Sequence, residues 1–555
     1  MNNKKDAKLI SNEKVIIVGS ISIGVIGYFV TRYLNSKKNL QKYEEIIECL
    51  NPKENNSNDI TTTDLITKRI KNLQIFNQLL LEDNNPPLLE SLMEGTFFSK
   101  LIPNLFLMNF ELEIEVLDTL LFSTKDEINC RAIIREDGIK FLLEYMNYRL
   151  NYENQENLDK KNYSISNSTI QLITKACKTI SRIIQKLKGL VLSEILTTKS
   201  TSIFVDLLKI PNEKLQRFSA ECLTWISEGY SEIIYDLYRL IDSNDLIALL
   251  NSNDVKKLIA VSSLILDCLT LNQFFLSEMF QKGILRSLAE IIQKHDDKEL
   301  LCNCILATSR LFTLKFCTPK MIEKNNLIPN VIKICFINQN DDKLNYAGCF
   351  FVNLLMDNTE EHKKFALKYH ILPYLIELFN SPCIRVVKQS LEALKNSSIS
   401  SAENIQELIN LNILDYLFPL AWRFSRNESI KHNIAIIIAL NQEEIRNSGA
   451  LKKIIQILDS NQYYSIISSL FALKKFSEPI EGINSEIWRK NVEFLVQNGC
   501  IERLIRIATL RDENLTKLAN DCLVQLENHS SVKSIIQKFN AEISRLQEQS
   551  TQKSN

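Results

Sequence analysis

Glycine and proline are scarce in this chain: its 555 residues contain 12 glycines and 11 prolines. Tight hairpins and barrel corners depend on these two residue types, so their scarcity argues against a strand-rich fold. Three of the glycines, Gly19, Gly24 and Gly27, fall within one apolar run, which leaves the rest of the chain with fewer still. We therefore expect a fold that is almost entirely helical.

Net charge is also absent, because Lys+Arg and Asp+Glu each number 66. A nucleic-acid binder that works through bulk positive charge is thereby excluded, although a local patch is not. The length exceeds what one hydrophobic core usually serves, so several domains or an elongated repeat are expected.

Patterns that carry catalysis or bind metal are missing as well. The five histidines are His295, His362, His370, His432 and His529, and none lies in an HExxH or Cys/His zinc pattern. Cys302 and Cys304 share one helical stretch, which turns their side chains to different faces. The sequence has no glycine-rich phosphate loop and no nucleophile elbow. We therefore predict no enzymatic activity, no metal ion and no cofactor.

Cysteine, in contrast, is well represented, with thirteen residues spread along the chain. Most lie in apolar stretches, such as FSAECLTWI around Cys222 and YAGCFFVNLL around Cys349. An odd number of scattered, apolar cysteines indicates buried free thiols in a reducing compartment rather than a disulfide framework.

A repeated pattern organises most of the sequence. Ten stretches share a small or polar first residue, two apolar residues and a short apolar helix. They begin at Lys100, Gly138, Ser202, Asn244, Gly283, Asn326, His370, Asn412, Gly449 and Gly499. Successive starts are separated by 38, 64, 42, 39, 43, 44, 42, 37 and 50 residues. A period of roughly 40 to 47 residues is typical of two- or three-helix repeats.

Residues 356–398 show the repeat most clearly. A short helix, EEHKKFALKY, leads to a second helix, ILPYLIELF, with Pro373 near its first turn, and a third helix, IRVVKQSLEALKNSS, follows the polar break NSPC. This arrangement resembles the armadillo repeat, whose third-helix ending is matched by AGCFFVNLLMDN with Asn353 and SLEALKNSS with Asn396. The resemblance covers residues 63–527, about ten repeats, and implies an all-α, armadillo/HEAT-like right-handed α-solenoid.

Two intervals depart from the period. The long interval contains a polar insertion near residues 148–168, and the last interval contains EPIEGIN within residues 478–486. We expect both to be surface loops, either tolerated variation or partner-binding segments. Residues 528–555 read as an amphipathic capping helix, with Ser530 or Ser531 as its N-cap, and a polar tail.

The resemblance also indicates a candidate groove. In armadillo proteins similar to importins and catenins, third-helix asparagines grip an extended peptide, because each amide offers both a donor and an acceptor. Most of that ladder is missing here, and the equivalent slots hold Ser309, Asn353 and Asn396. Trp225 matches the family's groove tryptophan, and it either lines the groove or packs within its own repeat. These four residues are the candidate partner groove, which suits folded or helical partners better than nuclear-import peptides.

The apolar run itself spans residues 15–34, with no charge from Val15 to Thr31. Twenty helical residues extend about 30 Å, which is enough to cross a bilayer core. A cleaved signal and a buried core helix are the alternatives. No small-residue cleavage site follows the run, and it is apolar on all sides, so we predict a transmembrane anchor. A basic tail (1–14) precedes this anchor, and a juxtamembrane helix with a polar hinge (35–62) follows it.

Small residues on this predicted membrane helix indicate a packing face. Ser20 and Gly24 are four residues apart, as are Gly27 and Thr31. Such spacing lets two membrane helices approach closely, so a homodimer is one expected consequence. The short, β-branched span with basic flanks resembles anchors of the mitochondrial outer membrane more than those of the endoplasmic reticulum, with the body in the cytosol.

These features together predict a scaffold or adaptor. We expect a membrane-anchored armadillo protein that binds cytosolic protein partners and no nucleic acid. Its likeness to anchored armadillo proteins implies a role in mitochondrial trafficking or dynamics. The alternative is a soluble-type cargo receptor, or a junction or cytoskeletal adaptor.

Overall fold

Helices form every regular element described by the computed structural model of this chain. The structure describes residues 50, 62–82, 97–156, 165–197, 201–229, 233–314, 317–337, 341–424, 426–440, 446, 449–459, 463–477, 485–510, 512–527, 529–530, 532–538 and 541. The chain divides into two units, Met1–Phe275 and Leu276–Asn555. The prediction of an all-helical fold is confirmed for the described residues. The predicted tail (1–14) and anchor (15–34) lie outside them.

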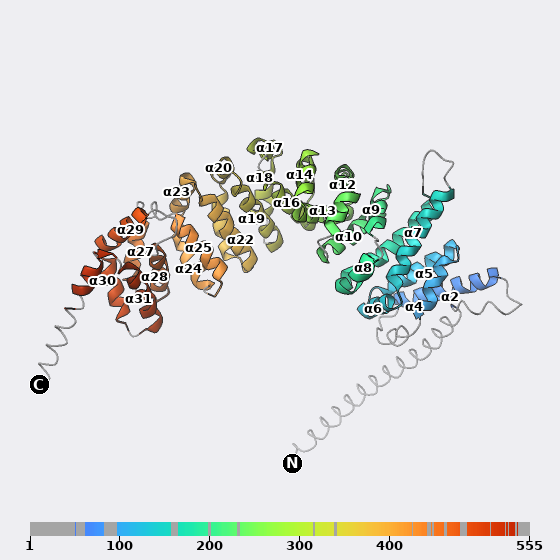
Figure 1. Cartoon of the computed structure of the whole chain (residues 1–555), viewed down its shortest axis with the longest axis horizontal. Helices are drawn as coiled ribbons and strands as arrows, with labels where there is room; N and C mark the ends of the chain where they lie inside the picture. The colour runs from blue at the N-terminus through green and yellow to red at the C-terminus, as the bar shows by residue number, and fades with distance from the viewer. Residues whose placement is uncertain are drawn as a thin grey trace, which may run out of the picture. The chain divides into compact units, whose positions relative to one another are not determined.

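The first unit is a row of helices labelled in Figure 1. Its helices are α2 (Thr62–Glu82), α4 (Phe97–Leu101), η2 (Ile102–Phe106), α5 (Phe110–Ser123), α6 (Glu127–Arg135), α7 (Gly138–Glu156), α8 (Asn167–Thr197), α9 (Thr201–Lys209), α10 (Glu213–Gly229), α11 (Ile233–Leu240), α12 (Ser243–Leu249) and α13 (Val255–Leu271). The last helix of each repeat, which we call the third helix, packs against the next third helix of the unit in chain order. The third helices of this unit are α2, α5, α8, α10 and α13.

The second unit follows the same plan, after α14 (Gln273–Gln281), in which the division between the units falls. Its helices are α15 (Ile284–Lys294), α16 (Lys298–Leu311), α17 (Pro319–Lys324), α18 (Leu327–Ile332), η3 (Lys333–Ile337), α19 (Asp342–Met356), α20 (Glu360–Lys368), α21 (Ile371–Glu377), η4 (Leu378–Asn380), α22 (Ile384–Ser398), α23 (Ala402–Asn410), α24 (Leu414–Arg423), α25 (Glu428–Leu440), α27 (Ala450–Ile457), α28 (Tyr463–Ser477), α29 (Ser485–Gln497), α30 (Cys500–Ala508) and α31 (Glu513–Leu526). The third helices α16, α19, α22, α25, α28 and α31 pack in chain order.

Left-handed residues explain the period that the sequence shows. Six of the ten predicted starts have a positive φ, and each lies just before the second helix of a second-unit repeat. They are Gly283 (90°), Asn326 (51°), His370 (50°), Asn412 (53°), Gly449 (77°) and Gly499 (67°). Glycine and asparagine tolerate this conformation best, which is why the starts carry small or polar residues. In the first unit, Asp137 (φ 55°) takes this role one residue before the start at Gly138.

Side-chain caps define where many third helices begin. Asp297 accepts hydrogen bonds from the backbone N–H groups of Glu299 and Leu300, both at 3.0 Å, at the start of α16. Other third helices are capped in the same way, for example by Asn109, Asp254, Asp341 and Asp512. Each cap stabilises its helix by about 1 kcal/mol, because it satisfies N–H groups that have no partner within the helix.

The structure differs from the surface loop that we expected at residues 148–168. α7 continues to Glu156 and α8 begins at Asn167, so only residues 157–164 of the insertion lie outside the described part. The helix continues because side chains one turn apart support it, as in the Tyr148 and Tyr152 rings, whose centroids are 6.2 Å apart. Polar composition alone therefore gave a wrong boundary here. Most of the other insertion, residues 478–484, lies outside the described residues.

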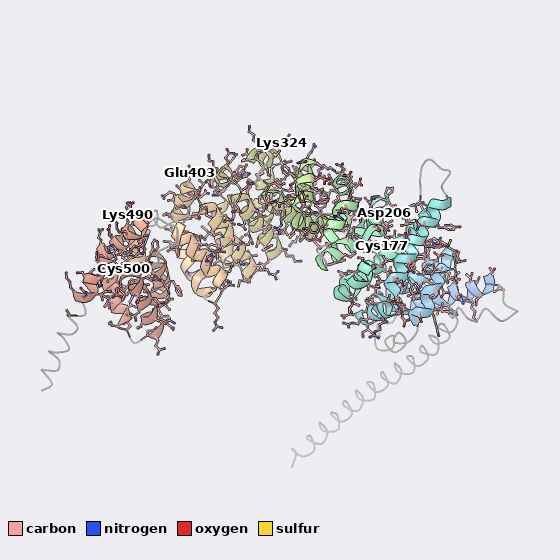
Figure 2. All side chains as sticks on the ribbon, viewed as in Figure 1. Cys177, Asp206, Lys324, Glu403, Lys490 and Cys500 are labelled. Atoms are coloured by element: carbon pink, nitrogen blue, oxygen red, sulfur yellow. The ribbon has the colours of Figure 1, made fainter. Side chains whose placement is uncertain are left out.

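Most of the described cysteines are buried in the core. Twelve of the thirteen cysteines are described and all twelve are free; only Cys302 and Cys383 are partly exposed. Burial raises the pKa of Cys130 to about 11 and that of Cys317 to about 12, so these thiols stay protonated and unreactive. Cys177, labelled in Figure 2, is another buried example. The prediction of buried free thiols is confirmed for the described cysteines, and the reducing compartment stays a prediction.

A buried ion pair connects α5 to α7. Glu113 is completely buried and accepts hydrogen bonds from the Arg149 guanidinium, with Nε at 3.1 Å, and from the Tyr145 hydroxyl. Burial, followed by the neighbouring carboxylate, raises the pKa of Tyr145, so its hydroxyl stays protonated and donates. The carboxylate thus has partners on the facing helix in place of water.

Removing the arginine from this cluster should destabilise the first unit strongly. We expect Arg149→Met to cost about 3–5 kcal/mol, because it leaves the buried Glu113 charge without its cation. The double variant Glu113→Leu/Arg149→Met should recover most of the loss, since neither charge then remains. Urea unfolding, monitored by circular dichroism, measures the free energy of unfolding of both variants. Arg131→Met is the matched control, because Arg131 and its partner Glu127 are half exposed. Equal losses in Arg149→Met and the control would contradict this account.

Relieving the left-handed strain at His370 should have the opposite effect. We expect His370→Gly to raise the free energy of unfolding by up to about 1 kcal/mol, because glycine adopts φ 50° without a Cβ clash. His295→Gly is the matched control: His295 ends α15 with φ −112°, where glycine relieves nothing. The urea concentration at the midpoint of unfolding compares the stabilities of the two variants. A similar loss of stability in both variants would show that the junction is not strained.

Candidate partner-binding surface

Packing between neighbouring helices leaves each third helix only a narrow exposed stripe. On α8, Lys175, Lys178 and Arg182 are half-buried, whereas the residues between them are almost all buried. Their spacing of three and four residues puts them on one side of the helix. On α10 the corresponding positions are Arg217, Glu221 and Trp225.

We call the first-unit set the basic stripe. It consists of Asp118 on α5, Lys175, Lys178 and Arg182 on α8, and Arg217, Glu221 and Trp225 on α10. It has four basic and two acidic residues, so its formal charge is positive. The predicted groove residue Trp225 lies on this stripe, half-buried, one turn after Glu221.

Both acidic residues of the basic stripe are already paired. Lys175 forms an ion pair with Asp118 across α5 and α8, and the Arg217 Nε lies 2.8 Å from Glu221 Oε1. Glu221 also accepts a hydrogen bond from the Ser181 hydroxyl at 2.9 Å, which links α10 to α8. The carboxylates thus hold neighbouring third helices together.

The remaining positive charge concentrates around Lys178. Burial lowers the pKa of Lys178, and the positive charges of Arg182, Arg217 and Lys175 lower it further. The Lys178 Nζ lies 5.6 Å from the centre of the Phe218 ring, and the Arg217 guanidinium lies 5.0 Å from it. Partial burial weakens screening by solvent, so an incoming anion interacts more strongly here than at an exposed lysine.

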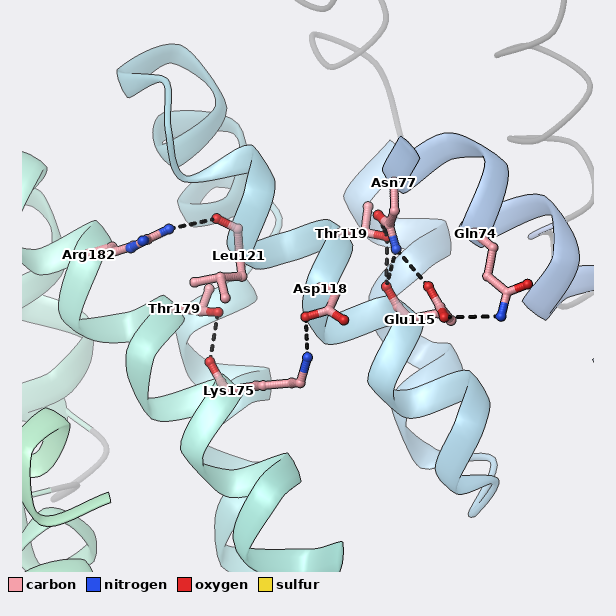
Figure 3. A network of polar contacts seen from close by, with 9 residues as sticks. All are labelled: Gln74, Asn77, Glu115, Asp118, Thr119, Leu121, Lys175, Thr179 and Arg182. Atoms are coloured by element: carbon pink, nitrogen blue, oxygen red, sulfur yellow. Dashed lines mark hydrogen bonds and ion pairs between the residues drawn. The ribbon is translucent and has the colours of Figure 1, made fainter. Parts of the chain in front are cut away.

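A network of hydrogen bonds extends from the basic stripe toward α2, as Figure 3 shows. The Asn77 amide of α2 donates to Glu115 Oε2 at 2.9 Å and accepts from the Thr119 hydroxyl at 2.7 Å. Gln74 also donates to Glu115, at 3.2 Å. On the other side of α5, the Arg182 guanidinium donates to the Leu121 carbonyl oxygen. These contacts fix the side chains in a defined row, which reduces the entropy lost when a partner binds.

The second unit has a stripe of different chemistry, which we call the aromatic stripe. It consists of Arg310 on α16, Tyr346, Phe350 and Asn353 on α19, and Asn396 on α22. The Arg310 guanidinium lies 4.8 Å from the centre of the Phe350 ring, which stacks on Tyr346 at 6.1 Å. Burial lowers the pKa of Arg310, and its Nε makes no hydrogen bond with any described residue. This cation and its two rings form a compact contact surface.

Among the predicted groove residues, the structure joins two. The Asn396 amide donates to Asn353 Oδ1 at 2.7 Å, connecting α22 to α19, and only 9% of Asn353 is exposed. Ser309, by contrast, is completely buried, and its hydroxyl donates to the Ile305 carbonyl oxygen at 2.6 Å. The next residue, Arg310, occupies the partly exposed position instead. The structure thus places the predicted residue Ser309 in the core of its repeat.

Several stripe residues were not identified from the sequence. Lys178, Arg182, Arg310, Tyr346 and Phe350 are the main ones. The sequence did contain a pattern that could have identified Lys178 and Arg182. Together with Lys175, they recur at helical spacing within an otherwise apolar segment.

The other predicted face, Ser20, Gly24, Gly27 and Thr31, lies outside the described residues. In the part of the chain that the structure describes, none of the helices combines the length and apolar character that a membrane crossing requires.

No protein-family model matches this chain, and no curated protein matches its sequence. Solved structures do resemble it. One, described as an engineered protein, has a TM-score of 0.55 and 15% identity, covering 88% of this chain and 99% of its own. Another comes from a study of a phosphorylation switch that controls the interaction between cadherin and beta-catenin, an armadillo protein. It has a TM-score of 0.55 and 12% identity, covering 84% of this chain and 99% of its own. At these identities the likeness concerns the fold, which is armadillo-like.

Proposed function

We propose that this chain is a non-enzymatic scaffold that binds protein partners along its third-helix stripes, within a right-handed armadillo solenoid. The observation that carries the proposal is the basic stripe, where partly buried cations lie beside a half-buried tryptophan. Armadillo-like structural neighbours support a role in protein interaction. The absence of a recognisable catalytic motif from the sequence favours binding over chemistry.

The partner that best fits the basic stripe is an acidic protein segment. Carboxylates of such a segment would pair with Lys178 and Arg182, the two cations of the basic stripe that form no ion pair with any described carboxylate. Trp225 would pack against an apolar side chain of the same segment. The aromatic stripe suits a different contact, through stacking and amide hydrogen bonds, so the two units would select partners by different chemistry.

The proposal also includes attachment to a membrane through residues 15–34. Its support is the uncharged stretch from Val15 to Thr31, long enough for a bilayer core, with basic residues on both sides. The mitochondrial outer membrane is the proposed location, and residues 35–62 would connect the anchor to the scaffold. The face formed by Ser20, Gly24, Gly27 and Thr31 would allow two anchors to pair.

Charge reversal tests the basic stripe. We expect Lys178→Glu/Arg182→Glu to weaken binding of an acidic probe at least about tenfold, because two attractive contacts become repulsive. The probe is a fluorescein-labelled decapeptide of alternating glutamate and glycine, and fluorescence anisotropy gives its Kd. Binding to the unmodified protein should also weaken as salt is raised.

The control for this test is Lys140→Glu, because Lys140 is an exposed lysine on α7, outside the basic stripe. It changes one charge where the proposal requires no contact and should leave Kd almost unaffected. If the double variant binds the probe as tightly as the unmodified protein does, the acidic partner is the wrong assignment.

A fluorescent fusion of residues 1–50 tests the anchor. We expect it to outline mitochondria and to stay in the membrane pellet after carbonate extraction, because a transmembrane helix resists alkaline washing. A variant with Ile21→Lys and Val25→Lys, which interrupts the apolar run, should become diffuse. Diffuse signal from the unmodified fusion would instead favour the soluble-type adaptor.

A further inference from the structure

A cavity of about 480 Å³ lies in the second unit, and no residue of the aromatic stripe is among the described residues that line it. It opens between two successive repeats, where the second helices end and the third helix α19 begins. The residues used below are Phe336, Asp342, Asn345, Tyr374, Glu377 and Ser381, all of which line it. Its volume falls within the range of pockets that enclose a small ligand or a few side chains.

The aromatic wall of the cavity depends on an unusual local geometry. Lys333–Ile337 form a π-helical turn, a rare feature that often marks a functional site. Gly348 on α19 allows this turn to approach closely, since an added Cβ there would lie 2.6 Å from Cys335 Cβ and 3.0 Å from the Phe336 ring. Phe336 can therefore stack on Tyr374 of the next repeat, with ring centres 5.9 Å apart and planes 14° apart.

The polar lining consists mainly of hydrogen-bond acceptors. Asp342, at the start of α19, and Glu377, at the end of α21, supply two exposed carboxylates. Asn345 is only 7% exposed, and its Oδ1 accepts no hydrogen bond from any residue that the structure describes. A buried acceptor without a donor is costly, so a ligand that supplies an N–H group would gain affinity here.

Charges around the cavity favour a cation. No lysine or arginine is among the described residues that line it. The nearby Arg423 donates to the backbone carbonyl oxygens of Phe379 and Ser381, at 3.0 and 2.8 Å. The Ser381 hydroxyl donates to Asp342 at 3.3 Å, which leaves the other carboxylate oxygen for a ligand. The cavity therefore carries two negative charges that no lining cation offsets.

We propose that this cavity binds the guanidinium group of an arginine side chain from a protein partner. A planar guanidinium stacks on aromatic rings and donates several N–H groups in one plane, whereas an ammonium acts as a point charge. The two carboxylates, the Asn345 oxygen and the Phe336/Tyr374 wall match those properties. The described lining shares no residue with either stripe, so the proposal does not rest on the acidic partner.

Two peptides test the chemistry on the full chain. The probe is acetyl-Gly-Gly-Arg-Gly-Gly-amide, and its partner carries citrulline, which has nearly the same shape without the positive charge. Saturation-transfer NMR titration gives both affinities. We expect the arginine peptide to bind at least about fivefold more tightly than the citrulline peptide. Equal affinity, or no binding of the arginine peptide up to about 10 mM, would overturn the proposal.

Variants of the cavity residues test whether the arginine peptide binds in the cavity. Asp342→Asn and Glu377→Gln should each weaken the arginine peptide about fivefold, and Tyr374→Leu should weaken it as well. Glu403→Gln is the matched control, because Glu403 is an exposed carboxylate on α23 outside the cavity (Figure 2). Glu377 is exposed, so its variant should fold normally, and thermal melting checks this. Unchanged affinity in folded Glu377→Gln and Asp342→Asn would exclude the cavity as the site.

Discussion

The packing of each third helix between two others is the constraint on which the rest of this structure depends. Contact on two sides buries most of α8 and α10 and leaves a single stripe of partly exposed residues. A partner that lies along the third helices would contact that stripe. Because the stripe is only half exposed, its charges interact more strongly than charges on an open surface. The same packing that stabilises each unit thus decides which residues are available for recognition.

The sequence predicted the repeats well because their spacing has a local cause. A left-handed residue such as Gly283 or Asn412 recurs before a second helix, and few residue types tolerate it, so the pattern is visible without a structure. The exposed position on a third helix has no such signal. Ser309 and Arg310 differ by one residue, and only contacts with neighbouring helices decide which is buried. The cavity was equally hidden, since Phe336 and Tyr374 come from different repeats.

Neutral composition conceals a marked local separation of charge. Basic and acidic residues are equal in number over the chain, yet Lys178 lies among three other cations, whereas the cavity beside Asp342 has only acidic charges in its lining. Average charge therefore excludes binding driven by bulk attraction and leaves local recognition possible. A scaffold benefits from this arrangement, because distinct surfaces can select partners of opposite charge without attracting either kind non-specifically.

Several departures from regular helical geometry and pairing meet at the cavity. Within one pair of repeats the chain combines a π-helical turn, a glycine at a close helix contact and a buried amide oxygen to which no described residue donates. Each is unfavourable alone: glycine weakens a helix, and an unpaired buried acceptor loses its hydration. Folding stability does not explain why all three occur together. Local rules of this kind are broken mainly where function requires it, and a ligand that donates to Asn345 and stacks on the adjacent rings would compensate for these costs.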